Sequence, residues 1–163
     1  MLHWLGLSAL VIALDQATKL WVDKSMRLYE TIELLPFFQL TYLRNEGAAF
    51  SMLSSAGGWQ RWFFIALATG ASIGISIWLK RMPKTHRLEA CGWSLVLGGA
   101  LGNLIDRVIY GYVIDFVDVF WPGADLPHFP AFNVADIAIN IGVGLLLIDA
   151  FLQHRRMAAE ANS

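Results

Sequence analysis

Four stretches of the chain are almost continuously apolar, and polar positions gather in the segments between them. Each stretch has about the length at which a helix, rising about 1.5 Å per residue, crosses the roughly 30 Å hydrocarbon core of a bilayer. The pattern therefore predicts a mainly α-helical membrane protein of one domain with four transmembrane helices. They are expected at about residues 4–23, 60–80, 88–107 and 132–153.

The two polar segments on one side of these helices, residues 25–58 and 108–131, contain short runs typical of β-strands. Ile32–Leu43 and Tyr110–Phe120 are rich in β-branched and aromatic residues. Such composition favours a small β-sheet to which both segments contribute. Pro36 has no N–H group for an inner strand, so it indicates an edge or a bend.

Composition agrees with a membrane protein and narrows the possible functions. Hydrophobic residues make up 56% of the chain and charged residues 15%, whereas about 25% of the residues in soluble domains are charged. The formal net charge is −1, and Lys and Arg form no extended basic patch. Nucleic-acid binding is therefore not expected.

Positive charge is unevenly distributed and predicts the orientation in the membrane. Basic residues gather between the second and third helices and after the fourth, at Lys80, Arg81, Lys84, Arg87, Arg155 and Arg156. Cytoplasmic loops carry the excess of Lys and Arg in membrane proteins. Both termini are therefore expected in the cytoplasm, and segments 25–58 and 108–131 are expected on the outer side.

Two acidic residues lie in apolar surroundings on this expected outer side. Asp136 stands near the start of the fourth apolar stretch, and Asp115 lies within the apolar run Tyr110–Trp121. A carboxylate at membrane depth costs at least about 2.5 kcal/mol, so such acids face protein or water and are functional candidates. No Lys or Arg separates the two in sequence. This favours a pair that shares one proton.

Helical spacing places further polar residues beside this pair. Gly99, Asn103 and Arg107 share one face of the third helix, and Asn133 and Asp136 share one face of the fourth. With the amino terminus inside, all of them reach the same depth near the outer leaflet. We expect the two polar faces to point at each other.

Other residues at this depth have structural explanations. Asp15 and Lys19 stand four apart in the first helix, which is typical of an ion pair that allows a helix to insert. Arg107 either neutralises Asp106 and reaches the membrane surface or contacts a substrate. Gly99 and its neighbouring glycines favour close helix packing.

The acid pair alone leaves two functions open, and a third interpretation, a membrane-embedded binding scaffold, would not need two separated acids at one depth. Amide hydrolysis by an aspartic mechanism needs one ionised carboxylate to activate water and one protonated carboxyl to polarise the carbonyl group. A proton- or ion-coupled transporter also uses buried acids, but near the midplane of broken helices and often with inverted repeats, and the sequence has neither feature. The Ser, His and Cys residues form no nucleophile or zinc pattern, so no metal and no cofactor are expected.

Five short blocks of sequence carry most of these polar residues. They are Asp15-Gln16-x-x-Lys19, Asn45-x-Gly47-x-x-Phe50, Gly98-Gly99-Ala100-x-Gly102-Asn103-x-x-Asp106-Arg107, Val113-x-Asp115-Phe116 and Phe132-Asn133-x-Ala135-Asp136. In this order and with four spans, they resemble lipoprotein signal peptidase, the type II signal peptidase family of bacteria. The resemblance spans nearly the whole chain, and Asp118 is an extra acid that the family pattern does not require.

The resemblance implies an aspartic endopeptidase that removes the signal peptide of a prolipoprotein by cleaving before its lipid-modified cysteine. It implies Asp115 and Asp136 as the catalytic pair. The positions that match site-lining residues of the family are Asn45, Gly99, Asn103, Arg107 and Asn133. The partners would be a lipid-modified prolipoprotein and membrane lipid. We expect a monomer in the bacterial cytoplasmic (inner) membrane, with its site near the outer leaflet.

The segment Asn45–Ser55 is expected to lie in the membrane interface as a short helix or loop, because it carries apolar side chains at Phe50, Met52 and Leu53. We also expect it to form a mobile flap. A substrate with lipid chains has to enter sideways from the membrane, and the site then has to exclude bulk water.

Overall fold

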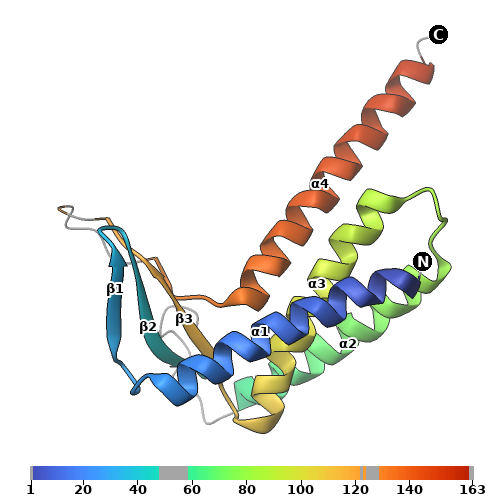
Figure 1. Cartoon of the computed structure of the whole chain (residues 1–163). Helices are drawn as coiled ribbons and strands as arrows, with labels where there is room; N and C mark the ends of the chain where they lie inside the picture. Colours follow the sequence, from blue (N-terminus) through green and yellow to red (C-terminus); the bar gives the residue numbers. More distant parts are fainter. Residues whose placement is uncertain (1, 48–58, 122, 124–128, 162–163) are drawn as a thin grey trace.

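The computed structural model describes residues 2–47, 59–121, 123 and 129–161 and contains four long helices (Figure 1). After a short 3-10 helix, η1 (Leu2–Trp4), these are α1 (Leu5–Ser25), α2 (Trp59–Arg81), α3 (Arg87–Ile109) and α4 (Val134–Ala161). All four are long and apolar enough to cross a membrane, as predicted. One boundary was wrong: α4 continues to Ala161 instead of ending at about residue 153, because its last turns contain good helix formers and no Gly or Pro.

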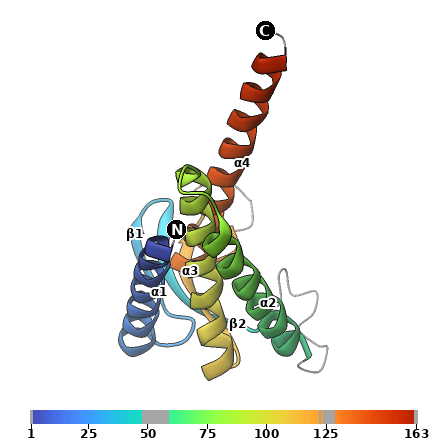
Figure 2. The same ribbon diagram turned by 90° about the vertical axis from the view of Figure 1, so that its right-hand side faces the viewer.

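The helix α3 lies at the centre of the bundle and packs against each of the other three helices (Figure 2). Two neighbouring glycines make this possible. A Cβ atom on Gly98 would lie 2.7 Å from the Cβ atom of Val11 on α1. A Cβ atom on Gly99 would overlap the carbonyl oxygen of Ala135 on α4. Small residues at these positions therefore allow the backbones of three helices to approach closely, as predicted for Gly99.

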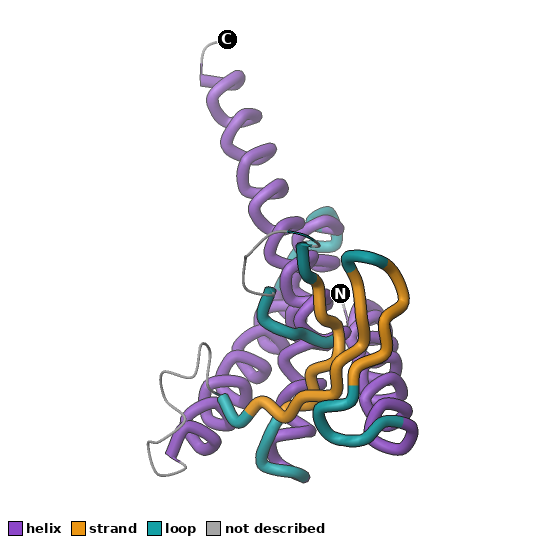
Figure 3. The backbone as a smooth tube through the Cα atoms, turned by 90° about the vertical axis from the view of Figure 1, so that its left-hand side faces the viewer, coloured by secondary structure: helices purple, strands orange, loops and turns teal. Residues whose placement is uncertain are grey.

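A three-stranded antiparallel sheet lies at the end of the bundle where α1 ends and α4 begins (Figures 1 and 3). Its strands are β1 (Thr31–Leu35), β2 (Phe38–Asn45) and β3 (Val113–Val119), in the order β1-β2-β3. The predicted first strand, Ile32–Leu43, is therefore two strands. Pro36 lies in the turn between them, which is the bend that its missing N–H group indicates.

A β-bulge between Leu40 and Leu43 changes which residues of β2 share a face with Asp115. Before it, Leu40 pairs with Val117; after it, Leu43 pairs with Asp115 and Asn45 with Val113. One extra residue in β2 reverses the alternation of its side chains. Asn45 consequently lies on the same face of the sheet as Asp115, where regular pairing would have placed it on the opposite face.

The sheet is joined to the helices on both of its sides. One face packs on the end of α1 through a buried cluster of Val22, Met26, Tyr42, Ile114 and Phe116. The segment that leads into α4 runs along β3, where Phe132 forms a bridge with Val117. These two connections bring β3 and the start of α4 together. The predicted interfacial flap falls mostly on residues 48–58, which lie outside the described residues.

Candidate active site

The side chain of Asp115 is buried in the space between the sheet and the start of α4. It is 3% exposed. Its Oδ1 atom accepts a hydrogen bond from Nδ2 of Asn133 at 2.7 Å, and its Oδ2 atom accepts one from Nδ2 of Asn45 at 2.9 Å. Both amides come from elements that β3 positions: the paired strand β2 and the segment before α4.

Asp136 lies in the first turn of α4 and is partly exposed. Its Oδ1 atom accepts a hydrogen bond from Nδ2 of Asn103 on α3 at 2.8 Å, and its Oδ2 atom accepts one from the backbone N–H group of Asn133 at 3.2 Å. Asn133 therefore bonds to both acids. The polar faces of α3 and α4 point at each other, as the helical spacing predicts.

Burial raises the pKa of the Asp115 carboxyl to about 7, and the neighbouring charge of Asp136 adds to this rise. The hydrogen bonds from Asn45 and Asn133 oppose it, because they stabilise the charged carboxylate. Below about pH 7 the Asp115 carboxyl therefore carries a proton. Asp136 stands in the first turn of α4, where the helix dipole favours an anion.

Three charged residues form a buried cluster, the Lys19 cluster, directly beside the acid pair. Lys19 forms ion pairs with Asp15, at 2.8 Å, and with Asp106 on α3, at 3.0 Å. Each of these side chains is at most 2% exposed. The predicted ion pair of Asp15 and Lys19 is thus present, and Lys19 also pairs with a second acid, Asp106.

Asp106 is bound by residues other than Arg107. Its oxygens accept hydrogen bonds from Gln16 at 2.8 Å and from the backbone N–H group of Ile114 at 3.1 Å, in addition to the Lys19 ion pair. Adjacent residues of a helix point in different directions, so Arg107 cannot share this position. Its guanidinium lies over the ring of Phe64 on α2, 4.9 Å from the ring centroid.

Arg107 nevertheless contributes positive charge to the site. It is partly buried and interacts electrostatically with Asp115, Asp136 and Asp106. Its contact with the backbone of Asn103, at 3.5 Å, is too long to restrain it strongly. The guanidinium therefore retains donors for another group.

Asp118 lies three residues after Asp115 and points to the opposite face of the sheet. Its Oδ2 atom accepts hydrogen bonds from Gln39 at 2.6 Å and from Thr41 at 2.9 Å. This extra acid is thus bound within the sheet and is separate from the acid pair.

Two contacts of the site were not predicted from sequence. Gln16 bonds to Asp106, and the backbone N–H group of Ala135 donates to Oδ1 of Asp15 at 2.8 Å. Gln16 had a signal, since it follows Asp15 in the first sequence block. The contact with Ala135 had none, because it joins a side chain to the exposed N–H group of another helix's first turn.

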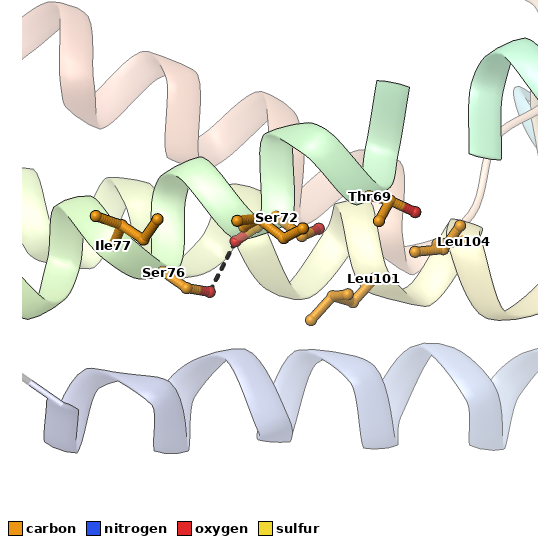
Figure 4. Close-up of a pocket in the computed structure, with 7 residues that line it drawn as sticks. Thr69, Ser72, Ser76, Ile77, Leu101 and Leu104 are labelled. Carbon is orange, nitrogen blue, oxygen red and sulfur yellow. Dashed lines mark hydrogen bonds between the residues drawn. The ribbon is translucent and has the colours of Figure 1, made fainter. Parts of the chain in front are cut away.

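An apolar groove of about 360 Å³ lies elsewhere on the bundle (Figure 4). Residues of α2 and α3 line it, including Ser72, Ile77 and Leu104, and none of the predicted site residues does. The Ser76 hydroxyl donates a hydrogen bond to the backbone carbonyl of Ser72 at 2.7 Å. Within the described residues, no group of three His, Cys, Asp or Glu side chains is arranged to hold a metal ion.

Comparison of the sequence with known proteins gives one family. A family model described as Signal peptidase (SPase) II matches residues 7–152. A lipoprotein signal peptidase of Pseudoalteromonas translucida is 55% identical over 150 residues, which cover 92% of this chain and 89% of the relative. One from Shewanella pealeana is 53% identical over 152 residues, covering 93% of this chain and 87% of the relative.

Solved structures agree with these relatives. A bacterial membrane enzyme determined by the in meso method at 2.3 Å resolution superposes with a TM-score of 0.78 and 34% sequence identity, covering 93% of this chain and 88% of that one. A second such enzyme, at 1.9 Å resolution, gives a TM-score of 0.77. These matches do not support the transporter alternative. By sequence over nearly its whole length, this chain belongs to the signal peptidase II family.

Proposed function

We propose that this protein is an aspartic endopeptidase of the bacterial inner membrane that cleaves a prolipoprotein before its lipid-modified cysteine. Its family and the names of its relatives support peptidase activity on prolipoproteins. The observation that supports the aspartic mechanism is the position of Asn133, which bonds to Asp115 and to Asp136 at the same time. Two acids held by one residue at one membrane depth suit water activation.

In the proposed mechanism, Asp136 acts as the base and Asp115 as the acid. The Asp136 carboxylate removes a proton from a water molecule, whose oxygen attacks the carbonyl carbon of the scissile amide. The proton on Asp115 polarises the carbonyl oxygen and is transferred to it. The tetrahedral intermediate then collapses, the C–N bond breaks, and the amide nitrogen leaves with the proton that Asp136 took up. Asp115 regains its proton from the intermediate.

The remaining site residues would bind the substrate or support the acids. Asn45 and Asn133 hold Asp115, and Asn103 holds Asp136. Arg107 would bind the peptide backbone or lipid of the substrate, because it is the positive group beside the acids with donors to spare. Gly99 keeps α4 close to α3 and so would hold Asp136 beside Asn103.

The orientation that the basic residues predict places this site near the outer leaflet, with both termini in the cytoplasm. This position suits a substrate whose lipid chains remain in the membrane during cleavage. We also propose a monomer as the active form.

The direct test uses purified protein with a synthetic precursor that carries a diacylglyceryl-modified cysteine. Mass spectrometry is expected to detect cleavage of the single peptide bond before that cysteine. The same precursor without the lipid is the matched control and is expected to be cleaved far more slowly. Uptake of ions or binding of the precursor, with no peptide released, would instead identify a transporter or a binding protein.

A further inference from the structure

Lys19 uses all three N–H groups of its ammonium, and only two of them bind acids. Nζ lies 2.8 Å from Asp15, 3.0 Å from Asp106 and 2.9 Å from the side-chain oxygen of Asn103. Lys19 is 1% exposed, so no water competes for these donors. The third bond, to Asn103, connects the Lys19 cluster to the acid pair, because Asn103 also bonds to Asp136.

The two ends of the Asn103 amide have different partners. Its oxygen accepts from Lys19 and, at 3.1 Å, from Nδ2 of Asn133, while its nitrogen donates to Asp136 at 2.8 Å. An amide turned by 180° would set its NH₂ group against the donors of Lys19 and Asn133, and its oxygen against the Asp136 carboxylate. Both contacts would be repulsive. Lys19 and Asn133 therefore fix the direction in which this amide points.

From this geometry we infer that Lys19 is a positioning residue for the peptidase reaction, which holds the Asn103 amide so that it donates to the Asp136 carboxylate. The inference rests on the proposed function, because it gives Lys19 a part in orienting the proposed base. A buried ion pair that only lets α1 insert needs no bond to Asn103. The two acids that Lys19 binds, Asp15 and Asp106, also accept hydrogen bonds from other groups. The Ala135 N–H group donates to Asp15, and Gln16 and the Ile114 N–H group donate to Asp106.

Several elements contribute charged groups around the bonds that join Lys19, Asn103 and Asp136. Asp15 lies on α1, Asp106 and Arg107 on α3, Asp115 on β3 and Asp136 on α4. Replacing Lys19 alone would leave Asp15 and Asp106 buried without a cation, which destabilises proteins strongly. The test therefore removes one acid together with the lysine.

The test variant is Asp15→Asn with Lys19→Met. It removes one anion and one cation, so the net charge of the Lys19 cluster is unchanged, and the asparagine retains an oxygen for Ala135 N–H. We expect kcat to fall at least about tenfold, with KM within about twofold of wild type, since an interaction that orients the base acts on turnover more than on binding. Lys24→Met, at an exposed lysine of the same helix, is the control and is expected to retain nearly full turnover. Asp15→Asn alone measures the part of the loss that comes from removing the acid.

Coupling to Asn103 separates positioning from a purely structural role. If Lys19 acts through Asn103, the loss of kcat in Asn103→Ala and the loss in the Lys19 variant will not multiply when the changes are combined. Lys19→Gln in the Asp15→Asn background, which keeps an N–H donor on a neutral side chain, is expected to recover part of the turnover. Losses that multiply fully would overturn the inference, and so would normal turnover in the folded test variant.

Failure of this inference is distinct from failure of the proposed function. If wild-type protein releases peptide and the Lys19 variants do so equally well, only the role of Lys19 is wrong. If wild-type protein releases none, the proposed function itself is wrong. Size-exclusion chromatography of each detergent-extracted variant establishes that it is folded. If Asp15→Asn with Lys19→Met does not fold, Asp15→Asn with Lys19→Gln, which is equally charge-balanced and keeps a polar side chain at position 19, supplies the same comparison in wild-type and Asn103→Ala backgrounds.

Discussion

Asn133 and Asp136 hold each other by two hydrogen bonds across the first turn of α4. The side-chain oxygen of Asn133 accepts from the backbone N–H group of Asp136 at 3.0 Å, and the Asp136 carboxylate accepts from the backbone N–H group of Asn133 at 3.2 Å. This reciprocal arrangement is a capping box, which satisfies N–H groups that a helix start leaves free. The same two side chains belong to the proposed catalytic site, so the helix start and the site stabilise each other.

Replacing Asn133 is therefore expected to affect stability and activity separately. Asn133→Ala removes the cap, which costs about 1 kcal/mol, and it also removes the bond to Asp115. Asn133→Ser retains a capping oxygen but no NH₂ group for Asp115. We expect thermal unfolding to show a loss of stability for Asn133→Ala and recovery for Asn133→Ser, while peptide release stays low in both. Full activity in Asn133→Ser would contradict the role of this bond.

The acid pair is expected to be indispensable. Asp115→Asn and Asp136→Asn should each lower kcat at least about a thousandfold while the protein still inserts, because each removes one member of a concerted pair. Asp118→Asn is the matched control on β3 and should have a mild effect, since Asp118 bonds within the sheet. Rates of release from a lipidated precursor measure all three. An equally large loss of kcat in Asp118→Asn would contradict the assignment of Asp115 and Asp136 as the catalytic pair.

The pH dependence of the reaction should follow the proton on Asp115. Because its pKa is raised to about 7, the carboxyl is protonated below this pH, and kcat/KM should fall as pH rises through it. Asn45 stabilises the ionised form, so Asn45→Ala should raise the pKa further and move the alkaline limb to higher pH. Gln39→Ala, which removes a donor to Asp118, should leave the limb in place. A shift of the limb to lower pH in Asn45→Ala would refute the assignment of the proton.

Gly99 offers a test of helix packing. A Cβ atom there would overlap the carbonyl oxygen of Ala135 and lie 2.7 Å from Cγ1 of Ile139. Gly99→Ala should therefore separate α3 from α4 and destabilise the protein by about 1–3 kcal/mol, with loss of activity because Asp136 moves with α4. Gly144→Ala is the control, since no atom lies within 4 Å of its Cβ position. Unchanged thermal stability of Gly99→Ala would disprove the close contact.

The orientation is tested by reporter fusions. A fusion at Lys84, in the basic connection between α2 and α3, should score as cytoplasmic, and a fusion near Gly123 should score as external. The reverse result at both positions would place the acid pair at the inner leaflet and contradict the proposed location of the site.

The spans and the acid pair were predictable from sequence because each leaves a local signal. A transmembrane helix is a long apolar run, and an acid in such a run is conspicuous. The facing of Asn103 toward Asp136 also followed, since helical spacing fixes which residues share a face.

The position of Asn45 and the partners of Lys19 depend on contacts that no local pattern encodes. The bulge in β2 carries no distinctive residue, yet it decides that Asn45 reaches Asp115. Lys19 shows an i, i+4 partner in sequence, but its bonds to Asp106 and Asn103 depend on how α1 packs on α3. The resemblance to the family marked Asn45 and Asn103 as site positions without their roles.

The bond from Asp15 to the backbone of Ala135 also has a consequence for biosynthesis. The first three long helices and the sheet precede Asn133 in the chain. The ribosome therefore synthesises all three residues of the Lys19 cluster before it synthesises α4, whose Ala135 bonds to Asp15. The free oxygen of Asp15 can receive the start of α4 only when that last segment is made. An unfinished chain would hold Asp115 without Asp136, so under the proposed aspartic mechanism it could not cleave a substrate before α4 is made.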